Sequence, residues 1–179
     1  MFFDCCPKGT LISYIDSEEA EYYAFKEGDK GYFLNFGKYE NNFENYLKSF
    51  NKKHRKNLNY DLRKLKEKGY IIERNNINNF ERLVELNKER FGKDSDYNDK
   101  DFVSSIKQLI DISVKKNIID FLSIKINNKV EAVGLGVFYN NTYYVIGLGR
   151  NTEVKNLGKL LISEHIKSAI ANKCNKMVS

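Results

Sequence analysis

The chain has 179 residues, of which 30 are lysine or arginine and 24 are aspartate or glutamate, so its formal net charge is +6. Hydrophobic residues make up 41% of the chain, which excludes an intrinsically disordered protein, and the single proline excludes collagen-like and proline-rich arrays. No stretch reaches the ~20 consecutive apolar residues that a membrane-spanning helix needs, so the sequence predicts no such helix.

The three cysteines indicate reduced thiols rather than a disulfide framework. Cys5 and Cys6 are adjacent, Cys174 lies far away, and an odd number cannot pair completely. The spacing of zinc ligands is absent as well, so we expect no metal site. The N-terminus does not resemble a secretory signal, because no basic segment is followed by an apolar one, and we predict a cytoplasmic protein.

The first 41 residues are predicted to form a β-rich segment that is distinct from the rest of the chain. Short runs typical of strands occur at 10–15, 21–25 and 32–36. The residues between the last two runs, Glu27-Gly28-Asp29-Lys30-Gly31, are typical of a hairpin turn. One interpretation of this segment is the tail of a preceding lobe, with the main domain at 42–179.

Between about 42 and 68 the apolar residues recur at spacings of three and four, which predicts one long helix with a single apolar face. The residues on this face are Phe43, Leu47, Phe50, His54, Leu58, Leu62 and Leu65. Gly69 is placed to end the helix, and a short strand is predicted at 70–73. Because His54 shares the apolar face, we expect it to be packed.

The same region carries nearly all of the positive charge. From Lys48 to Arg74 there are ten lysines and arginines and three acidic residues, a net charge of +7, so the remainder of the chain is near neutral at −1. Such a helix suits phosphates or carboxylates, including those of a nucleic acid, or it has only a solvated basic face. The residues alone leave these interpretations open.

Helices alternate with strands in the second half of the chain. The predicted elements are helices at 79–91 and 99–113, strands at 120–126, 130–139 and 142–148, a helix at 159–172 and a strand that begins at 174. Asparagine pairs typical of tight turns separate the three consecutive strands, which predicts an antiparallel meander. The fold class is therefore α+β, an α/β sandwich with a mixed, largely antiparallel sheet flanked by helices and preceded by the long basic helix.

Two glycine-containing segments are candidate ligand sites. The loop Lys155-Asn156-Leu157-Gly158-Lys159 joins a strand to a helix, where free N–H groups and the helix dipole favour an anion such as a pyrophosphate. It is neither a P-loop nor a dinucleotide fingerprint, and an ordinary helix start is the alternative. The glycines of Gly147-Leu148-Gly149 mark either a bulge where a ligand runs beside the backbone or plain turn residues.

The order of elements after residue 69 resembles the GNAT superfamily of N-acyltransferases. The segments Phe50-Asn51-Lys52-Lys53-His54-Arg55-Lys56-Asn57-Leu58 and Asp61-Leu62-Arg63-Lys64-Leu65 are similar to the basic helix S-x-K-H-R-x-x-x-R-x-x-R-K-L of one branch. That branch includes the Fem-type peptidyl transferases and acyltransferases once described as cellulose-biosynthesis proteins. Ala132-Val133-Gly134 and Asn156-Leu157-Gly158-Lys159-Leu160-Leu161 add to the resemblance.

The resemblance implies transfer of an acyl group from acetyl-CoA or another acyl-CoA to an amine-bearing acceptor. It places the pantetheine arm beside Val145, Ile146 and Gly147, the pyrophosphate on Lys155, Asn156, Leu157, Gly158, Lys159 and Leu160, and the substrate near Lys53, His54, Arg55 and Arg63. It assigns no catalytic base, although Glu131, Glu153 and Tyr144 lie near the relevant strands.

The alternatives follow from the same resemblance. Fem-type enzymes take aminoacyl groups from transfer RNA, and the basic helix suits that polyanion, so a tRNA-dependent transferase, a non-catalytic RNA-binding remnant and a degenerate fragment stay open. The chain departs from the family pattern in having Gly158 as the only glycine of the loop and Asn59 or Tyr60 where arginine is common. We expect the fold to be incomplete after residue 179, with its last strands missing and an open sheet edge that favours self-association.

Overall fold

The computed structural model describes residues 33–179, which form one of the two compact units into which the chain divides, the other being 1–32. The described unit therefore includes residues 33–41 as well as the predicted 42–179. The predicted strands at 10–15 and 21–25, the hairpin turn, and Cys5 and Cys6 lie outside the described residues.

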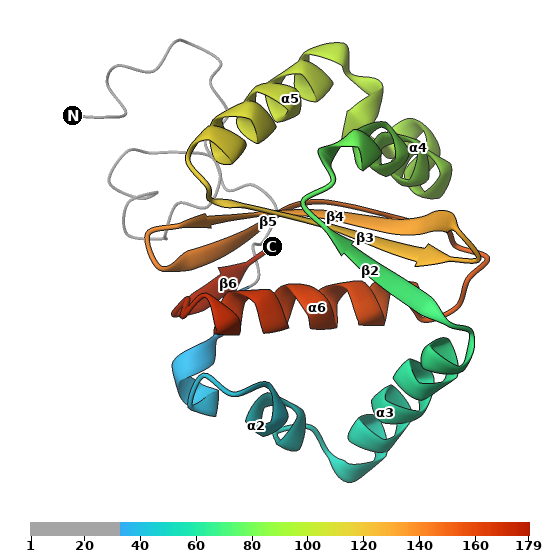
Figure 1. The fold of residues 1–179 in the computed structure, drawn as a ribbon. Coiled ribbons are helices and arrows are strands. Elements are labelled where there is room, and N and C mark those ends of the chain that lie inside the picture. The colour runs from blue at the N-terminus through green and yellow to red at the C-terminus, as the bar shows by residue number, and fades with distance from the viewer. Residues whose placement is uncertain (1–32) are drawn as a thin grey trace. The chain divides into compact units, whose positions relative to one another are not determined.

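A six-stranded sheet forms the centre of this unit, with the strand order β1-β6-β5-β4-β3-β2 (Figure 1). The strands are β1 Phe33–Asn35, β2 Tyr70–Arg74, β3 Ile119–Ile126, β4 Lys129–Tyr139, β5 Thr142–Arg150 and β6 Lys176–Val178. All neighbours are antiparallel except β5 and β6, which are parallel. The predicted mixed, largely antiparallel sheet is confirmed.

Asparagine pairs close both hairpins of the predicted meander. Asn127 and Asn128 join β3 to β4, Asn140 and Asn141 join β4 to β5, and all four have φ between 47° and 63°. A two-residue hairpin loop of type I′ requires positive φ at both positions, which asparagine tolerates better than most residues. The turn chemistry therefore sets the register of the three central strands.

The helices lie on both faces of the sheet, with α4 and α5 on one face and α6, α2 and α3 on the other (Figure 1). Their bounds are α2 Phe43–Lys48, α3 Lys52–Glu67, α4 Phe80–Phe91, α5 Lys100–Lys115 and α6 Leu157–Ala171. Each face has its own core, because side chains alternate across a strand. Leu83, Leu86 and Phe121 lie in the first core, and Leu122 and Leu161 in the second.

The prediction of one long helix over 42–68 is wrong, because the chain forms two helices there. The first ends at Lys48, and the side chain of Asn51 accepts the backbone N–H of His54 at 2.8 Å to cap the second. Asn51 itself has extended ψ of 156°, so it interrupts the helix while the apolar spacing continues on both sides. Gly69 ends α3 with φ +70°, as the sequence predicts.

The strand predicted to begin at 174 is present as β6, and β1 covers its outer edge in antiparallel pairing from Phe33 to Asn35. A strand from the N-terminal side of the chain therefore occupies the position next to β6 in the sheet. Self-association through an open edge stays a prediction.

Candidate functional site

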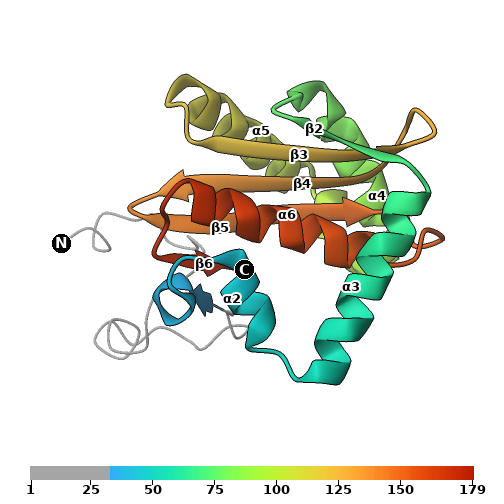
Figure 2. The ribbon, with the colours of Figure 1, turned by 60° about the horizontal axis from the view of Figure 1, so that its bottom comes forward.

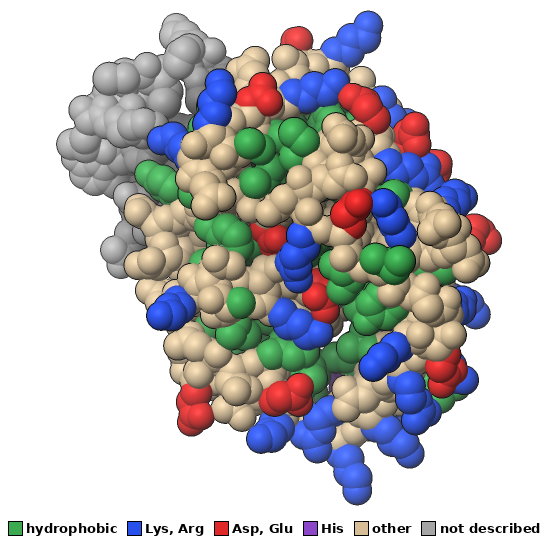
Figure 3. Space-filling view, viewed as in Figure 1, with side chains coloured by type: hydrophobic (Ala, Val, Ile, Leu, Met, Phe, Trp, Pro, Cys, Tyr) green, Lys and Arg blue, Asp and Glu red, His purple; other side chains and the backbone are tan. Residues whose placement is uncertain are grey.

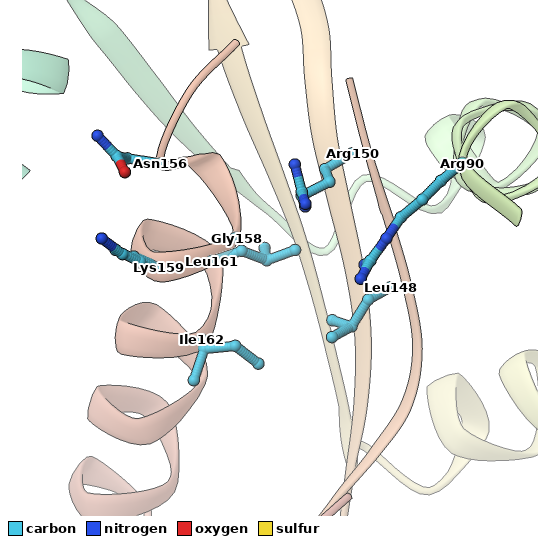
Figure 4. Close-up of a pocket in the computed structure, with 8 residues that line it drawn as sticks. All are labelled: Arg90, Leu148, Arg150, Asn156, Gly158, Lys159, Leu161 and Ile162. Carbon is cyan, nitrogen blue, oxygen red and sulfur yellow. The ribbon is translucent and has the colours of Figure 1, made fainter. Parts of the chain in front are cut away.

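A pocket of about 460 Å³ lies where the end of β5, the start of α6 and the end of α4 meet (Figure 4). Its lining residues are Arg90, Leu148, Arg150, Asn156, Gly158, Lys159, Leu161 and Ile162. Leucine and isoleucine side chains form one part of the wall, and basic groups with the helix terminus form the other, which suits a ligand that is part apolar and part anionic.

The sheet opens beside this pocket because β5 and β6 part from each other. β5 pairs with β6 only from Thr142 to Tyr144, whereas its other edge pairs with β4 as far as Arg150. From Val145 onward, the outer edge of β5 has no partner strand among the described residues. Along such an edge, backbone N–H and C=O groups are available to an extended ligand that carries amide groups, except for the Leu148 carbonyl, which accepts a hydrogen bond from Asn87.

A β-bulge lies within this open part of β5. Leu135 of β4 faces Gly147 and Gly136 faces Val145, so Ile146 is an extra residue without an opposite partner. A bulge bends the strand and takes the extra residue out of the regular hydrogen-bonded ladder. The predicted residues Val145, Ile146 and Gly147 thus lie where β5 both leaves β6 and changes its register.

The first turn of α6 lines the pocket and carries N–H groups without a partner in the helix. Asn156 precedes the helix with φ +70° and makes no side-chain capping bond, and the first turn contains no acidic residue. The first N–H groups of a helix have no partner within it, and the dipole adds partial positive charge there. The predicted loop is therefore a strand-to-helix junction, and α6 begins at Leu157 rather than at Lys159.

Two arginines from distant parts of the chain extend into the pocket (Figure 4). Arg150 ends β5 and Arg90 lies in the last turn of α4, and neither forms a hydrogen bond or ion pair with any residue of 33–179. Partial burial and then the positive charge of Arg150 lower the pKa of Arg90. Two neighbouring guanidinium groups without an acidic partner favour a bound anion.

Gly158 makes room for one of these arginines. A Cβ atom at this position would lie 3.2 Å from Nε of Arg150 and 3.4 Å from its Cδ. The first contact is tighter than an ordinary van der Waals contact, so with a larger residue the Arg150 side chain would have to shift by a few tenths of an ångström. Gly158 lies in the first turn of α6, so this glycine lets Arg150 approach the helix closely.

Lys159 joins the pocket to the basic helix α3. Its ammonium group lies 2.5 Å from the carboxylate of Asp61, and α3 lies beside the N-terminal part of α6 (Figure 2). Lysines and arginines gather over α3 on the surface drawn in Figure 3. The positive charge counted in the sequence is thus located next to the pocket.

The predicted anion-site residues divide into three groups. Asn156, Gly158 and Lys159 line the pocket, whereas the side chains of Leu157 and Leu160 are buried in the core beneath α6 and Lys155 is exposed. Leu157 and Leu160 can therefore offer a ligand only their backbone groups. Sequence reasoning missed four lining residues, namely Arg90, Arg150, Leu161 and Ile162, whereas Leu148 lies in the predicted segment Gly147-Leu148-Gly149.

The predicted substrate-binding residues all lie on α3, and none of them lines the pocket. Arg63 pairs with Glu67 at 4.0 Å, and Arg55 donates to the carbonyl oxygen of Lys48 at 3.4 Å. His54 is exposed and stacks on the ring of Phe50 at 4.6 Å rather than entering a core. Lys53 is exposed. Substrate contacts through these residues stay a prediction.

The two glycines at the end of β5 allow the α4 side of the molecule to pack directly on the strand. A Cβ atom on Gly149 would lie 2.6 Å from the carbonyl oxygen of Leu83, and one on Gly147 would lie 2.1 Å from the hydroxyl of Tyr97. Asn87 of α4 also donates to the carbonyl oxygen of Leu148 at 2.8 Å. The bulge is thus present, and on this face the space beside both glycines is filled by protein.

Three acidic or phenolic residues were considered near the strands, and none of them lines the pocket between β5, α6 and α4. Glu131 accepts a hydrogen bond from Asn151 at 2.8 Å, Glu153 is exposed, and Tyr144 is half-buried on β5. A catalytic base is therefore not assigned.

A buried polar network fastens the middle of α6 to the sheet. Asp120 of β3 accepts hydrogen bonds from the hydroxyl of Tyr143 at 2.7 Å and from Arg74 at 3.2 Å, while His165 contacts the same hydroxyl through Nδ1. Arg74 also pairs with Glu164 at 3.2 Å. Burial lowers the pKa of His165 to about 4 and raises the pKa of Tyr143, so both side chains are neutral at pH 7.

Within residues 33–179 no group of three or more histidine, cysteine, aspartate or glutamate side chains is arranged to hold a metal ion. No helix in the same part of the chain is long and apolar enough to cross a membrane.

Comparison with known proteins identifies the family of this chain and solved structures with a similar fold. A family model described as an acetyltransferase (GNAT) domain matches residues 52–178. No match was found among curated proteins.

Three solved structures illustrate the structural similarity, and all of them are less than 25% identical. FemX superposes with a TM-score of 0.63 at 12% identity over 82% of this chain and 51% of its own. A conserved protein of unknown function from Bacteroides thetaiotaomicron gives 0.53 at 10% identity over 83% and 49%. The PaiA N-acetyltransferase from Thermoplasma acidophilum in complex with coenzyme A gives 0.45 at 18% identity over 59% and 75%. The chain spans about half the length of the first two proteins.

Proposed function

The chain belongs to the GNAT family of acetyltransferase domains, and from this premise we propose that it transfers an acyl group from an acyl-CoA to an amine. One observation carries the proposal. The pocket joins two arginines, a helix N-terminus and an unpaired strand edge in one continuous surface.

Each part of coenzyme A has a matching feature on this surface. The pyrophosphate is an anion that suits Arg90, Arg150 and the N–H groups at the start of α6. The pantetheine arm carries amide groups that suit the open edge of β5 from Val145 to Arg150. The thioester then reaches the bulge at Ile146, where β5 and β6 part.

The chemistry asks mainly for positioning. The amine nitrogen attacks the thioester carbonyl carbon, the carbonyl oxygen gains negative charge, and the bond from carbon to sulfur breaks to release the thiol. Holding both reactants in line removes a large part of the barrier, and hydrogen-bond donors at the oxygen lower it further. Residues of β5 hold the donor in this scheme.

Melting temperature measured with and without coenzyme A or acetyl-CoA tests the proposal. A ligand at 100 times its dissociation constant adds about 2.7 kcal/mol to the free energy of unfolding, which raises the melting temperature by roughly 5–10 °C for a chain of this size. ATP at the same concentration is the control for unspecific anion binding. An equal shift with ATP, or no shift with coenzyme A, would refute the proposal. Mass spectrometry of a panel of amines incubated with acetyl-CoA then identifies the acceptor.

An aminoacyl-tRNA-dependent reaction of the Fem type is the second candidate. The fold similarity to FemX over 82% of this chain and the basic helix α3 support it. Binding to transfer RNA would weaken steeply with salt, because each neutralised phosphate releases counterions. If transfer RNA binds with such a slope and coenzyme A gives no thermal shift, this candidate replaces the first.

A further inference from the structure

Tyr97 presents a buried hydroxyl to the strand that would hold the donor. It lies in the short 3-10 turn Asp96–Asn98 between α4 and α5 and is 4% exposed. Its ring packs edge-on against Phe102 at 5.2 Å. The hydroxyl is enclosed and has no hydrogen-bond partner among the described residues.

The hydroxyl meets β5 at the bulge. A Cβ atom on Gly147 would lie 2.1 Å from the hydroxyl oxygen, so only a glycine lets Tyr97 reach the strand backbone there. Gly147 follows the extra residue Ile146 directly and lies three positions before Arg150, which is roughly 10 Å along a strand. The hydroxyl therefore lies beside the bulge, on the face of β5 that α4 also covers at Gly149.

Stability does not explain this hydroxyl. A buried polar group without a partner costs about 1–3 kcal/mol, and phenylalanine would fill the same space without that cost. Burial, and then the charge of Asp96, raise the pKa of Tyr97 to about 12. The group thus keeps its proton at pH 7 and is available as a donor.

We propose that the Tyr97 hydroxyl donates a hydrogen bond to the thioester carbonyl oxygen of the bound acyl donor, an inference that rests on the proposed function. When the amine nitrogen bonds to the carbonyl carbon, the electron pair of the C=O double bond moves to the oxygen, next to the Tyr97 O–H group. Collapse of this intermediate re-forms C=O, breaks the bond from carbon to sulfur and releases the thiolate. The proton that the amine loses reaches the thiolate through solvent, and Tyr97 keeps its own.

Infrared difference spectroscopy of acetyl-CoA labelled with 13C at the carbonyl tests this without knowledge of the acceptor. We expect the carbonyl stretch of the bound thioester at lower frequency in the wild-type protein than in Tyr97→Phe. Gly147→Ala, whose methyl group displaces the hydroxyl, should remove the same shift. Tyr139→Phe at the exposed end of β4 is the control and should keep it.

Two further measurements separate this role from a structural one. Tyr97→Phe should melt at the same or a higher temperature than wild type, because it removes an unsatisfied buried group. With an amine acceptor, the kcat of Tyr97→Phe should be roughly 100-fold or more below that of wild type, while the KM for acetyl-CoA changes little. A loss of this size is expected when one hydrogen-bond donor to a developing oxyanion is removed.

The outcomes are distinguishable from those of the proposed function. If wild type binds acetyl-CoA but its carbonyl frequency equals that of Tyr97→Phe, the inference is wrong and the proposed function stands. If acetyl-CoA produces no thermal shift in the wild type, both are wrong.

Discussion

The middle of α6 and its N-terminus differ in how the arginines beside them are paired. Around the middle of the helix, Arg74, Asp120 and Tyr143 satisfy one another beneath His165 and Glu164. At its N-terminus, Arg90 and Arg150 lie together without an acidic partner in the described part of the chain. Both regions are polar and both involve arginine, yet only the arginine around the middle of the helix has acidic partners among the described residues.

This difference separates a structural site from a binding site. The ion pairs of Arg74 and the bond from Tyr143 to Asp120 stabilise the packing of α6, although Nε2 of His165 has no hydrogen-bond partner among the described residues. Two guanidinium groups that repel each other gain free energy only when an anion binds between them. Shifted pKa values occur in both regions and therefore do not distinguish a structural site from a binding site. The presence or absence of acidic partners for the arginines does.

Removal of both pocket arginines should have the largest effect. Hydrogen bonds to charged groups contribute about 1.5–3 kcal/mol each, so Arg90→Ala combined with Arg150→Ala should weaken coenzyme A binding by roughly 100-fold or more. Isothermal titration calorimetry measures the dissociation constant. Lys115→Ala, on the exposed side of α5, is the control and should bind like wild type. Unchanged affinity in the double variant would remove the anion site from this pocket.

Acid should destabilise the network around Asp120 through His165. Its pKa is about 4 in the folded protein and near 6.5 when unfolded, so the unfolded state binds more protons between these values. Stability is therefore complete above pH 6.5 and is lost as the pH falls toward 4, by up to ~3 kcal/mol.

Urea unfolding from pH 4 to pH 7 measures that loss. The slope of the free energy of unfolding against pH should be smaller in His165→Gln than in wild type. His54→Gln replaces an exposed histidine and should keep the wild-type slope. Equal slopes for all three proteins would show that His165 is not buried in its neutral form.

Asp120→Ala should destabilise the same network at neutral pH. It removes the acceptor of Arg74 and of the buried Tyr143 hydroxyl. The cost should be ~2–3 kcal/mol, below that of a fully buried pair, because the Arg74 side chain is 43% exposed. Thermal denaturation should show a decrease of roughly 4–12 °C. Asp111→Ala on the exposed face of α5 is the matched control, and an equal loss there would contradict the assignment.

Asp61→Asn should have the smallest effect. It should lower the stability of the protein slightly and raise its affinity for coenzyme A. An exposed ion pair contributes ~0.2–1 kcal/mol, so loss of the bond to Lys159 should lower stability slightly. Lys159 is a residue of the pocket lining, and without its counter-charge its ammonium group would make the potential around a bound anion more positive. Coenzyme A should bind a few-fold more tightly at low salt, and the gain should disappear as salt is raised.

The sequence predicted those parts of the fold that depend on neighbouring residues. The asparagine pairs predicted both hairpin turns, and Gly69 predicted the end of α3. The spacing of apolar residues predicted where the helices lie. The break between α2 and α3 was missed because apolar spacing continues across it. Asn51, a side chain suited to capping, was the local signal for it.

The candidate site was predicted only along the continuous segment from Val145 to Leu160. Its two arginines come from elements sixty residues apart in the chain, so no spacing in the sequence relates them. The same holds for Tyr97, whose hydroxyl reaches Gly147 only because α4 and α5 pack on β5. The sequence marked Gly147 and Gly149 as candidate ligand positions, but it did not show that Tyr97 and Leu83 pack against them.

By itself the sequence determined the class of the fold, the meander and the concentration of positive charge in α3, because these follow from composition, side-chain periodicity and turn chemistry. The tertiary structure decided which charges are neutralised and which are left for a ligand. That choice depends on the separation of β5 from β6 and on the packing of α4 and α6 against the sheet, which bring distant side chains within a few ångströms of each other.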